Sequence, residues 1–203
     1  MKFLKALPLI LLFFTNIGLS SDTTQKYIQI SNQKQTESDK IVIYEFFWYG
    51  CPHCYNLEPT MGRIESNLEK DTILVKVPVA LRDTWESHAK AYYALQQMNL
   101  DDNLHEKIFT EIHINSNRLD TKEKLTQFIE DEGYNSKRFS EIFDSFGTDI
   151  RVKKASRLAN QYQITSVPTL IINGKYKTSG SFVSSYEELY DVVQLLINKE
   201  RIN

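Results

Sequence analysis

Several features that often reveal a function are missing from this sequence of 203 residues. Its 24 lysines and arginines nearly balance 26 aspartates and glutamates, and the formal net charge is −2. There is therefore no global basic field for nucleic acid and no acidic tail. We find no internal repeat and no low-complexity segment. With 41% hydrophobic and 25% charged residues, the composition indicates one soluble globular domain, or one domain with a sizeable insertion.

Cysteine is also scarce: there are only two, Cys51 and Cys54, inside the stretch FFWYGCPHCYNLEP. In the chain-entropy model a disulfide that closes four residues contributes only about 2 kcal/mol, against about 4.7 kcal/mol for a hundred residues. A structural disulfide would therefore be better placed between distant parts of the chain. The Cys-x-x-Cys spacing instead indicates a redox centre.

The first twenty residues have the three-part layout of a secretory signal peptide. Two lysines in MKFLK precede the uncharged run ALPLILLFFTNIGL, and Gly18 and Ser20 are small residues spaced for cleavage after Ser20. A retained anchor is less favoured, because a bilayer span needs about 20 apolar residues. No cysteine follows the run, which argues against lipid attachment. We expect a mature protein that starts near Ser21 and is exported to an oxidising compartment, where paired cysteines form disulfides.

The apolar pattern of the mature chain predicts an α/β domain. Residues 27–30 are compatible with an edge strand, and residues 41–48 (IVIYEFFW) with a central strand covered on both faces. An amphipathic helix follows the cysteines, and a second buried strand is expected over 72–79. Later, residues 165–172 lead into Asn173-Gly174, a strong hairpin signal, with a return strand over 175–178. A closing helix begins near Ser184.

Residues 82–150 have helical periodicity throughout, so this segment is expected to be an all-helical domain inserted into the α/β domain. Residues 21–81 and 151–203 would then form the first and second parts of the interrupted α/β domain. Gly133 and Gly147 are placed where helix C-caps are expected. A further helix is predicted over 151–162.

The cysteine pair lies where a strand ends and a helix begins, and this position carries chemistry. The first helical turn has unpaired N–H groups and the positive end of the helix dipole, so a thiolate at Cys51 is stabilised. Pro52 suits the first helical position, and His53 is expected to stabilise the thiolate further. Cys54 is expected to be the more buried sulfur. Stabilising the reduced thiolate makes the disulfide a stronger oxidant, so we predict that the pair donates disulfides.

A zinc site is the main alternative for a Cys-x-x-Cys pair. It needs two more ligands, but no second cysteine pair exists and the four histidines form no closely spaced doublet. Redox chemistry is therefore favoured and no metal is expected. We interpret His53 as functional, because it lies between the cysteines. The other histidines, His88, His105 and His113, are interpreted as surface or capping residues of the helical segment.

Two segments, FFWYGCPHCY and the later SVPTLIINGKY, together resemble the DsbA family of bacterial thiol:disulfide oxidases. The likeness covers essentially the whole mature chain. It implies a thioredoxin-like fold interrupted by a helical domain, which agrees with the order of elements above, and a periplasmic location. It also implies reoxidation by a quinone-linked membrane partner of the DsbB type, with no metal or organic cofactor.

The resemblance implies roles for five further residues. Pro168 is similar to the cis-proline that lies beside the disulfide in this family, and Val167 would offer its backbone to a client in β-fashion. Glu45, Glu58 and Lys76 match the charged positions around the active site. Independently of the family, a charge within an apolar strand must be paired or neutralised, so Glu45 and Lys76 are expected to pair beneath the disulfide. The alternative is that they lie at strand ends in water.

Two neighbouring aromatic residues complete the expected site. Trp48 is expected to be a packing residue, and Tyr49 to lie at the rim. The dipeptide Tyr49-Gly50 stands where some family members have bulky aromatics, so we expect a smaller rim near the reactive sulfur.

The function predicted from the sequence is oxidation of reduced, newly secreted proteins by the Cys51–Cys54 disulfide. A disulfide isomerase or reductase on the same scaffold is the nearest alternative. Isomerases of this fold usually add a dimerisation domain, and here only polar residues 21–40 precede the first central strand, which favours a monomer. A binding module without catalysis, which grips unfolded chains, is the alternative from a different class.

Overall fold

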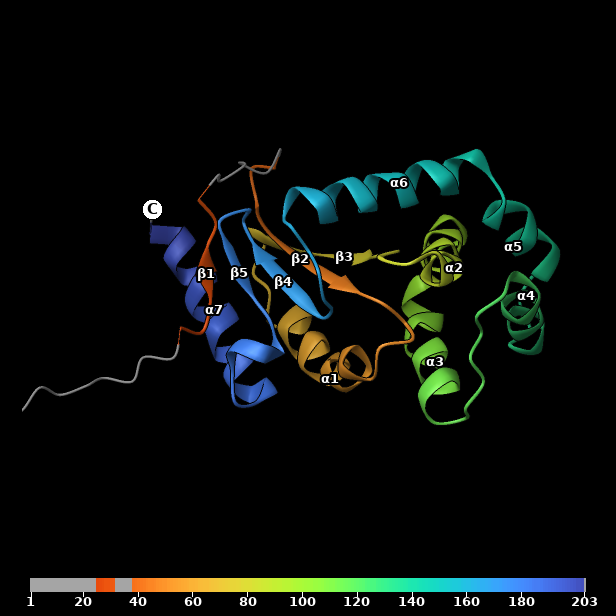
Figure 1. The fold of residues 1–203 in the computed structure, drawn as a ribbon, viewed down its shortest axis with the longest axis horizontal. Helices are drawn as coiled ribbons and strands as arrows, with labels where there is room; N and C mark the ends of the chain where they lie inside the picture. The colour runs from red at the N-terminus through yellow and green to blue at the C-terminus, as the bar shows by residue number, and fades with distance from the viewer. Residues whose placement is uncertain (1–24, 32–37, 203) are drawn as a thin grey trace, which may run out of the picture.

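The computed structural model describes residues 25–31 and 38–202, and within them a five-stranded sheet has the order β1-β5-β4-β2-β3 (Figure 1). β2 lies between the parallel strand β3 and the antiparallel strand β4, so both of its edges are paired. The strands are β1 Ile28–Gln29, β2 Ile41–Phe47, β3 Thr72–Pro78, β4 Thr169–Ile172 and β5 Tyr176–Thr178.

Helices cover both faces of this sheet (Figure 1). α1 (Pro52–Ser66) and α7 (Tyr186–Ile202) lie on one face, and α6 (Phe146–Gln161) lies on the other. Alternate residues of a strand point to opposite faces, so Ile43 packs with α1 and α7 while Phe46 packs with α6. By the same alternation, Glu45 of β2 faces α1, the helix that carries the cysteines.

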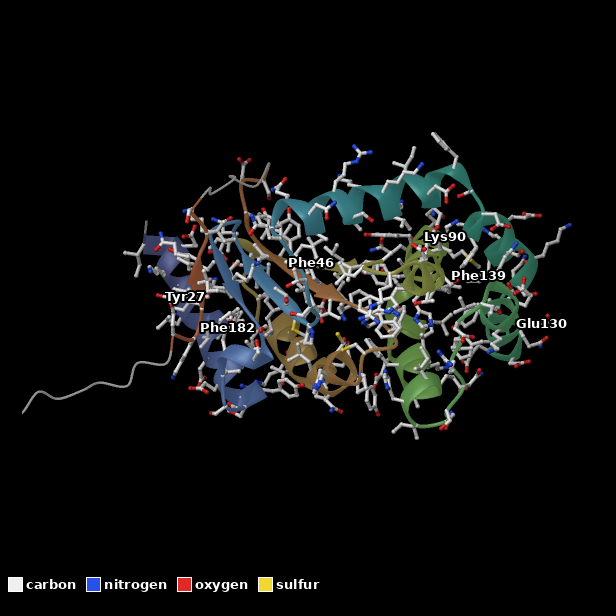
Figure 2. All side chains as sticks on the ribbon, in the orientation of Figure 1. Tyr27, Phe46, Lys90, Glu130, Phe139 and Phe182 are labelled. Atoms are coloured by element: carbon white, nitrogen blue, oxygen red, sulfur yellow. The ribbon has the colours of Figure 1, made fainter. Side chains whose placement is uncertain are left out.

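A helical block lies beyond the end of β2 and β3 (Figure 1). Its core includes Leu95, Ile108 and Phe139 and is continuous with Phe47 and Tyr49, which come from the end of β2 and the turn after it. Figure 2 labels Phe46 within the sheet and Phe139 within the block. The helices of the block are α2 Glu86–Met98, α3 Asp101–His113, α4 Lys122–Asp131 and α5 Ser136–Phe143, and two short 3-10 turns, Asp83–Trp85 and Gly180–Phe182, precede α2 and α7.

The predicted α/β fold with an inserted helical segment is confirmed. The hairpin signal is also confirmed, because Asn173 and Gly174 both have positive φ, 48° and 68°, between β4 and β5. Gly133, with φ 83°, lies just past the end of α4, as expected of a C-cap glycine. Strand β4 is shorter than predicted and begins only at Thr169, after Pro168, which has no N–H to donate to a sheet.

The end of the helical segment differs from the prediction. α6 is continuous from Phe146 to Gln161, so a division at residue 150 would cut one helix in two. The prediction of Gly147 as a C-cap was wrong. Ser145 is instead the N-cap of α6, and its side chain accepts a hydrogen bond from the N–H of Thr148 at 3.2 Å. Gly147 therefore lies in the first turn of α6 and not at the C-terminus of a helix.

The expected signal peptide, residues 1–20, lies outside the described residues, and so does its cleavage site. Over the ranges 25–31 and 38–202, no helix has both the length and the apolar content needed to cross a membrane.

Candidate active site

The cysteine pair lies at the N-terminus of α1, as the sequence predicts. Cys51 is the N-cap residue with extended backbone, Pro52 opens the helix, and Cys54 lies one turn further in. Both cysteines are free thiols in the structure. The exposed fraction is 8% for Cys51 and 0% for Cys54, so Cys54 is the more buried sulfur. The backbone therefore presents one sulfur near the surface and withdraws the other.

The two thiols have opposite acidities. The pKa of Cys51 is lowered to about 6, chiefly by a hydrogen bond from the thiol of Cys54, which outweighs the effect of burial. The backbone N–H groups of Cys54 and His53 and the charge of His53 lower it further. Burial, followed by the nearby Cys51 sulfur, raises the pKa of Cys54 well above its usual range. At neutral pH the reduced pair is thus one thiolate and one thiol.

Val167 and Pro168 lie beside the reactive sulfur. The peptide bond between them is cis, and Sγ of Cys51 lies 3.5 Å from the carbonyl oxygen of Val167. A groove of about 450 Å³ starts here. Tyr186 closes one side of it, and its hydroxyl donates a hydrogen bond to the carbonyl oxygen of His53 at 3.1 Å. The other side chains that line the groove are largely serines: Ser166, Ser179, Ser181, Ser184 and Ser185.

Three ionisable side chains gather on the inner side of α1. Lys76 stands opposite Glu45 in the register of β2 and β3, and its Nζ lies 3.3 Å from Oε2 of Glu58. Glu45 is fully buried, and neither of its carboxyl oxygens has a hydrogen-bond partner among the described residues. The structure therefore does not contain the expected direct pair of Glu45 with Lys76. Lys76 comes from the edge strand and binds Glu58 instead, where both side chains keep some contact with water.

Burial controls the ionisation of this cluster. Together with the negative charge of Glu58, it raises the pKa of Glu45 to about 8, while Lys76 opposes both effects. Burial also opposes ionisation of Glu58, but the contacts with His105 and Lys76 prevail and lower its pKa. One carboxyl is thus held neutral and the other charged near pH 7.

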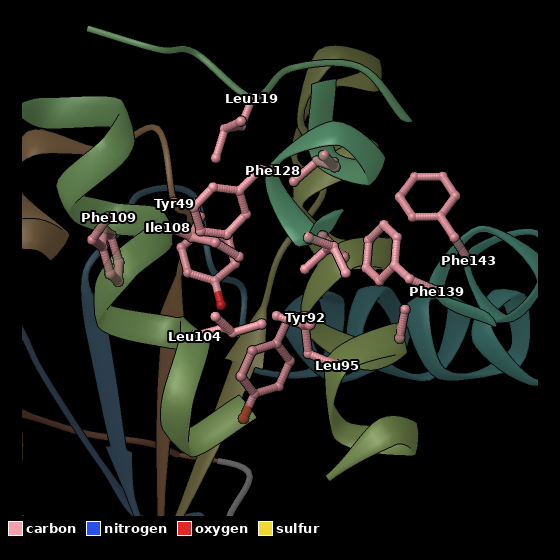
Figure 3. Close-up of a cluster of buried hydrophobic side chains, with 14 of the residues drawn as sticks. Tyr49, Tyr92, Leu95, Leu104, Ile108, Phe109, Leu119, Phe128, Phe139 and Phe143 are labelled. Atoms are coloured by element: carbon pink, nitrogen blue, oxygen red, sulfur yellow. The ribbon is translucent and has the colours of Figure 1, made fainter. Parts of the chain in front are cut away.

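Several predictions for the neighbouring residues were wrong. Tyr49 is fully buried rather than at the rim (Figure 3). His88 and His105 are buried, with exposed fractions of 3% and 7%, rather than at the surface. His113 is half-buried in the last turn of α3, and its Nε2 donates to the carbonyl oxygen of Tyr49 at 2.8 Å. The sequence signal for His105 was its position beside the apolar stripe of α3. The burial of such a polar residue cannot be predicted from its own helix, because it depends on which face of the helix another part of the chain covers.

The residues around Gly50 explain the shape of the rim. The rings of Trp48 and Trp85 stack with centroids 4.0 Å apart. A Cβ atom on Gly50 would come within 2.3 Å of the Trp48 ring, so the stack leaves room only for glycine. Trp48 is a packing residue, as predicted. The small residue before Cys51 thus serves the packing of Trp48 against Trp85.

No group of three or more His, Cys, Asp or Glu side chains is arranged to hold a metal ion within the part of the chain that the structure describes.

A cysteine pair of split acidity, at a helix N-terminus and beside a cis-proline, on a sheet covered by helices, defines a thiol:disulfide oxidoreductase of the thioredoxin fold. Residues 42–191 match the family described as "DSBA-like thioredoxin domain". The chain belongs to this family.

Known relatives agree with this assignment. The chain is 33% identical over 178 residues to the thiol:disulfide interchange protein DsbA of Pseudomonas aeruginosa, an alignment that covers 87% of this chain and 84% of the relative. It is 35% identical over 162 residues to the protein of the same name from Pseudomonas syringae, covering 80% and 76%. The crystal structure of Pseudomonas aeruginosa DsbA superposes with a TM-score of 0.83 at 32% identity, covering 87% of this chain and 93% of that one.

Proposed function

We propose that this protein oxidises pairs of thiols in reduced, newly exported proteins, and that Cys51 is the sulfur that clients attack. The observation that carries the proposal is the split acidity of the pair. The thiolate of Cys51 is stabilised, with a pKa of about 6, while Cys54 remains a thiol. A stabilised thiolate is a good leaving group, and it favours the reduced form of the pair, which makes the disulfide an oxidant.

The exchange proceeds in two displacements. A client thiolate attacks Sγ of Cys51, the Cys51–Cys54 bond breaks, and Cys54 leaves as a thiolate that takes up a proton because its pKa is high. A second client thiolate then attacks the client sulfur of the mixed disulfide and expels Cys51 as a thiolate. The client loses two electrons and gains a disulfide. The protein gains both electrons, so the pair itself carries the redox change and no metal or organic cofactor is needed.

Each surrounding residue has a role in this scheme. Pro52 starts the helix whose N–H groups face Cys51, and His53 stabilises the thiolate. Val167 and Pro168 border both the sulfur and the groove, so an extended client segment would pair with the backbone of Val167 there. Glu45 keeps a proton near Cys54, and it donates this proton when Cys54 leaves.

The partners follow from the same chemistry. Substrates are reduced proteins, and each turnover leaves the pair reduced, so an oxidant must restore it. A quinone-linked membrane reoxidase of the DsbB type fits this need. The signal-peptide layout of residues 1–20 supports export to the periplasm, where such an oxidase acts before proteins fold. We expect the protein to act as a monomer.

The alternatives have less support. A reductase or isomerase would gain from a less stabilised thiolate than that of Cys51. A binding module without catalysis has no use for a lowered thiol pKa beside an accessible groove.

The test is oxidation of a reduced model protein by the purified disulfide form, together with its reduction potential against glutathione. Wild type is expected to oxidise the model protein stoichiometrically and to have an oxidising potential. Alkylation of reduced Cys51 is expected to follow a pH midpoint of about 6. A strongly reducing potential would instead assign the protein as a reductase, and slow alkylation below neutral pH would refute the donor role.

A further inference from the structure

The helical block supplies a histidine to the charged cluster beneath the active site. His105 lies on α3, and its side chain is buried between the block and α1. Nδ1 of His105 is 2.8 Å from the hydroxyl of Tyr49, and Nε2 is 3.2 Å from Oε2 of Glu58. The same carboxylate oxygen lies 3.3 Å from Nζ of Lys76. One chain of contacts therefore runs from Tyr49 through His105 and Glu58 to Lys76.

The surroundings hold this histidine in one orientation. Its ring makes edge contacts with Phe47, Tyr92 and Phe109, with centroids 5.2 to 5.8 Å apart. In Figure 3 the ring of Tyr49 lies among the side chains of the block, close to Ile108. Burial lowers the pKa of His105, so near neutral pH the ring is uncharged. A charged carboxylate can only accept, so the tautomer with its proton on Nε2 suits this site, and Nδ1 then accepts from the Tyr49 hydroxyl. The 3.2 Å contact of Nε2 with Oε2 of Glu58 is electrostatic and lacks the geometry of a hydrogen bond.

A second groove borders this cluster, and the side chains of Lys76 and Glu58 are 17% and 14% exposed. This groove of about 1090 Å³ runs between α1, β3, α2 and α3, and Glu58, Lys76 and His105 all line it. The other titratable groups that face His105 or this groove are Tyr49 from the turn before α1, Tyr55 and Glu65 from α1, Tyr92 from α2, and Asp101 and Glu106 from α3.

We propose that His105 is a positioning residue for the redox centre. With Tyr49 it holds the Glu58 carboxylate beside Lys76, and the charge held there keeps the proton on Glu45 that Cys54 takes up. The inference rests on the proposed oxidase function and deepens it. By this inference the inserted block takes part in the redox chemistry, because its His105 influences the ionisation of Glu45 and Glu58 near the first turn of α1. The electrostatic contacts of Glu45 with both Glu58 and Cys54 complete the connection.

The direction of the effect follows from competition between two carboxyls. When the contact from His105 is lost, the pKa of Glu58 rises, so Glu58 and Glu45 compete for the same proton. Glu45 then loses its proton at a lower pH. Protonation of Cys54 then becomes slower at alkaline pH. At acid pH Glu45 is protonated with or without the His105 contact, so the rate is unchanged.

The experiment compares His105→Leu with wild type for oxidation of a short peptide that carries two cysteines, from pH 5.5 to 8.5. The ratio of the two rates at each pH cancels the ionisation of the peptide thiols. We expect a ratio near 1 at pH 5.5 that falls by about threefold or more at pH 8, which is a modest part of what a positioned acid contributes. Glu58→Gln is expected to abolish any further effect of His105→Leu, since His105 acts through Glu58.

A matched pair of tyrosines serves as the control. Tyr49→Phe removes the hydroxyl that bonds to His105 and is expected to shift the ratio in the same direction by a smaller factor. Tyr92→Phe keeps the ring that contacts His105 and removes a part-buried hydroxyl that bonds only to Gln96 in the described chain, so its ratio is expected to stay constant with pH.

The outcomes separate this inference from the proposed function. If wild type does not oxidise the peptide, the oxidase function itself fails. If wild type is active and the ratio for folded His105→Leu is constant with pH, or is additive with Glu58→Gln, His105 has only a packing role and the inference is overturned. Should His105→Leu not fold, Tyr49→Phe and His105→Gln decide between the same two roles. Gln keeps a donor towards Glu58 and is expected to restore the wild-type profile.

Discussion

The two sides of the first turn of α1 offer a contrast within a few residues. On the outer side, Cys51 borders a small groove lined by serines, Val167 and Pro168. On the inner side, Cys54 is fully buried, and Glu45 acts on it electrostatically. One turn of helix thus separates a sulfur that is stable as a thiolate from a sulfur that is stable as a thiol. The difference shows that the oxidising character comes from the asymmetry of the pair, not from either cysteine alone.

The largest expected effect comes from removing one sulfur at a time. Cys51→Ser is expected to reduce the oxidation rate by at least about 10³-fold, because the nucleophile that forms the mixed disulfide is gone. In reduced Cys54→Ser, the Cys51 thiolate attacks a client disulfide and forms a mixed disulfide that no second cysteine can release. Gel analysis without reductant checks both results. Equal trapping by the two variants would show that the sulfurs are interchangeable.

The inner side is tested by Glu45→Gln through stability. Because burial raises the folded pKa of Glu45 from 4.5 to about 8, the folded state holds a proton that the unfolded state has lost between these values. The stability due to this group is therefore complete below pH 4.5 and declines as pH rises to about 8. Glu45→Gln is expected to remove this decline, a relative gain of about 2–4 kcal/mol between pH 5 and pH 8.

Urea unfolding of wild type and Glu45→Gln at the two pH values measures this difference. An exposed carboxyl offers the control: Glu187→Gln, whose side chain pairs with Arg63 at the surface, is expected to change little. A wild-type stability that does not decline relative to Glu45→Gln would mean that Glu45 is charged in the folded protein.

The outer rim is tested by Gly50→Ala. The new methyl group would lie 2.3 Å from the Trp48 ring, so the stack of Trp48 on Trp85 must open. We expect a loss of about 1–3 kcal/mol of stability and a change in tryptophan fluorescence. Gly62→Ala is the control, because an added methyl group there meets no atom within 4 Å, and Ala is favoured within a helix. Equal effects of the two substitutions would remove the packing explanation.

The smallest effect is expected from Tyr186→Phe, which removes the hydrogen bond to the carbonyl oxygen of His53 at the groove. The bond is partly exposed, so we expect a loss of about 1 kcal/mol or less, with the alkylation midpoint of Cys51 almost unchanged. A large shift of that midpoint would mean that the groove wall, and not the first turn of α1, controls the acidity of Cys51.

Local pattern was enough to predict the redox site. Residues 41–48 read as a buried strand, Pro52 as a helix start, and Asn173-Gly174 as a hairpin, because each depends on neighbours in the chain. The inserted block was predicted from its continuous helical period. The burial of His88 and His105 was not predicted, since it depends on helices that come from other parts of the chain.

Cys51, Pro52, His53 and Cys54 are consecutive, so their chemistry follows from backbone geometry within a single turn, and reading the chain alone suffices to name it. The ionisation of Glu45, Glu58 and Lys76 depends instead on which charges meet in the interior. These residues come from β2, α1 and β3, and the fourth partner, His105, comes from the inserted block. Electrostatic energies depend on distance and burial, which folding sets and residue order along the chain does not reveal.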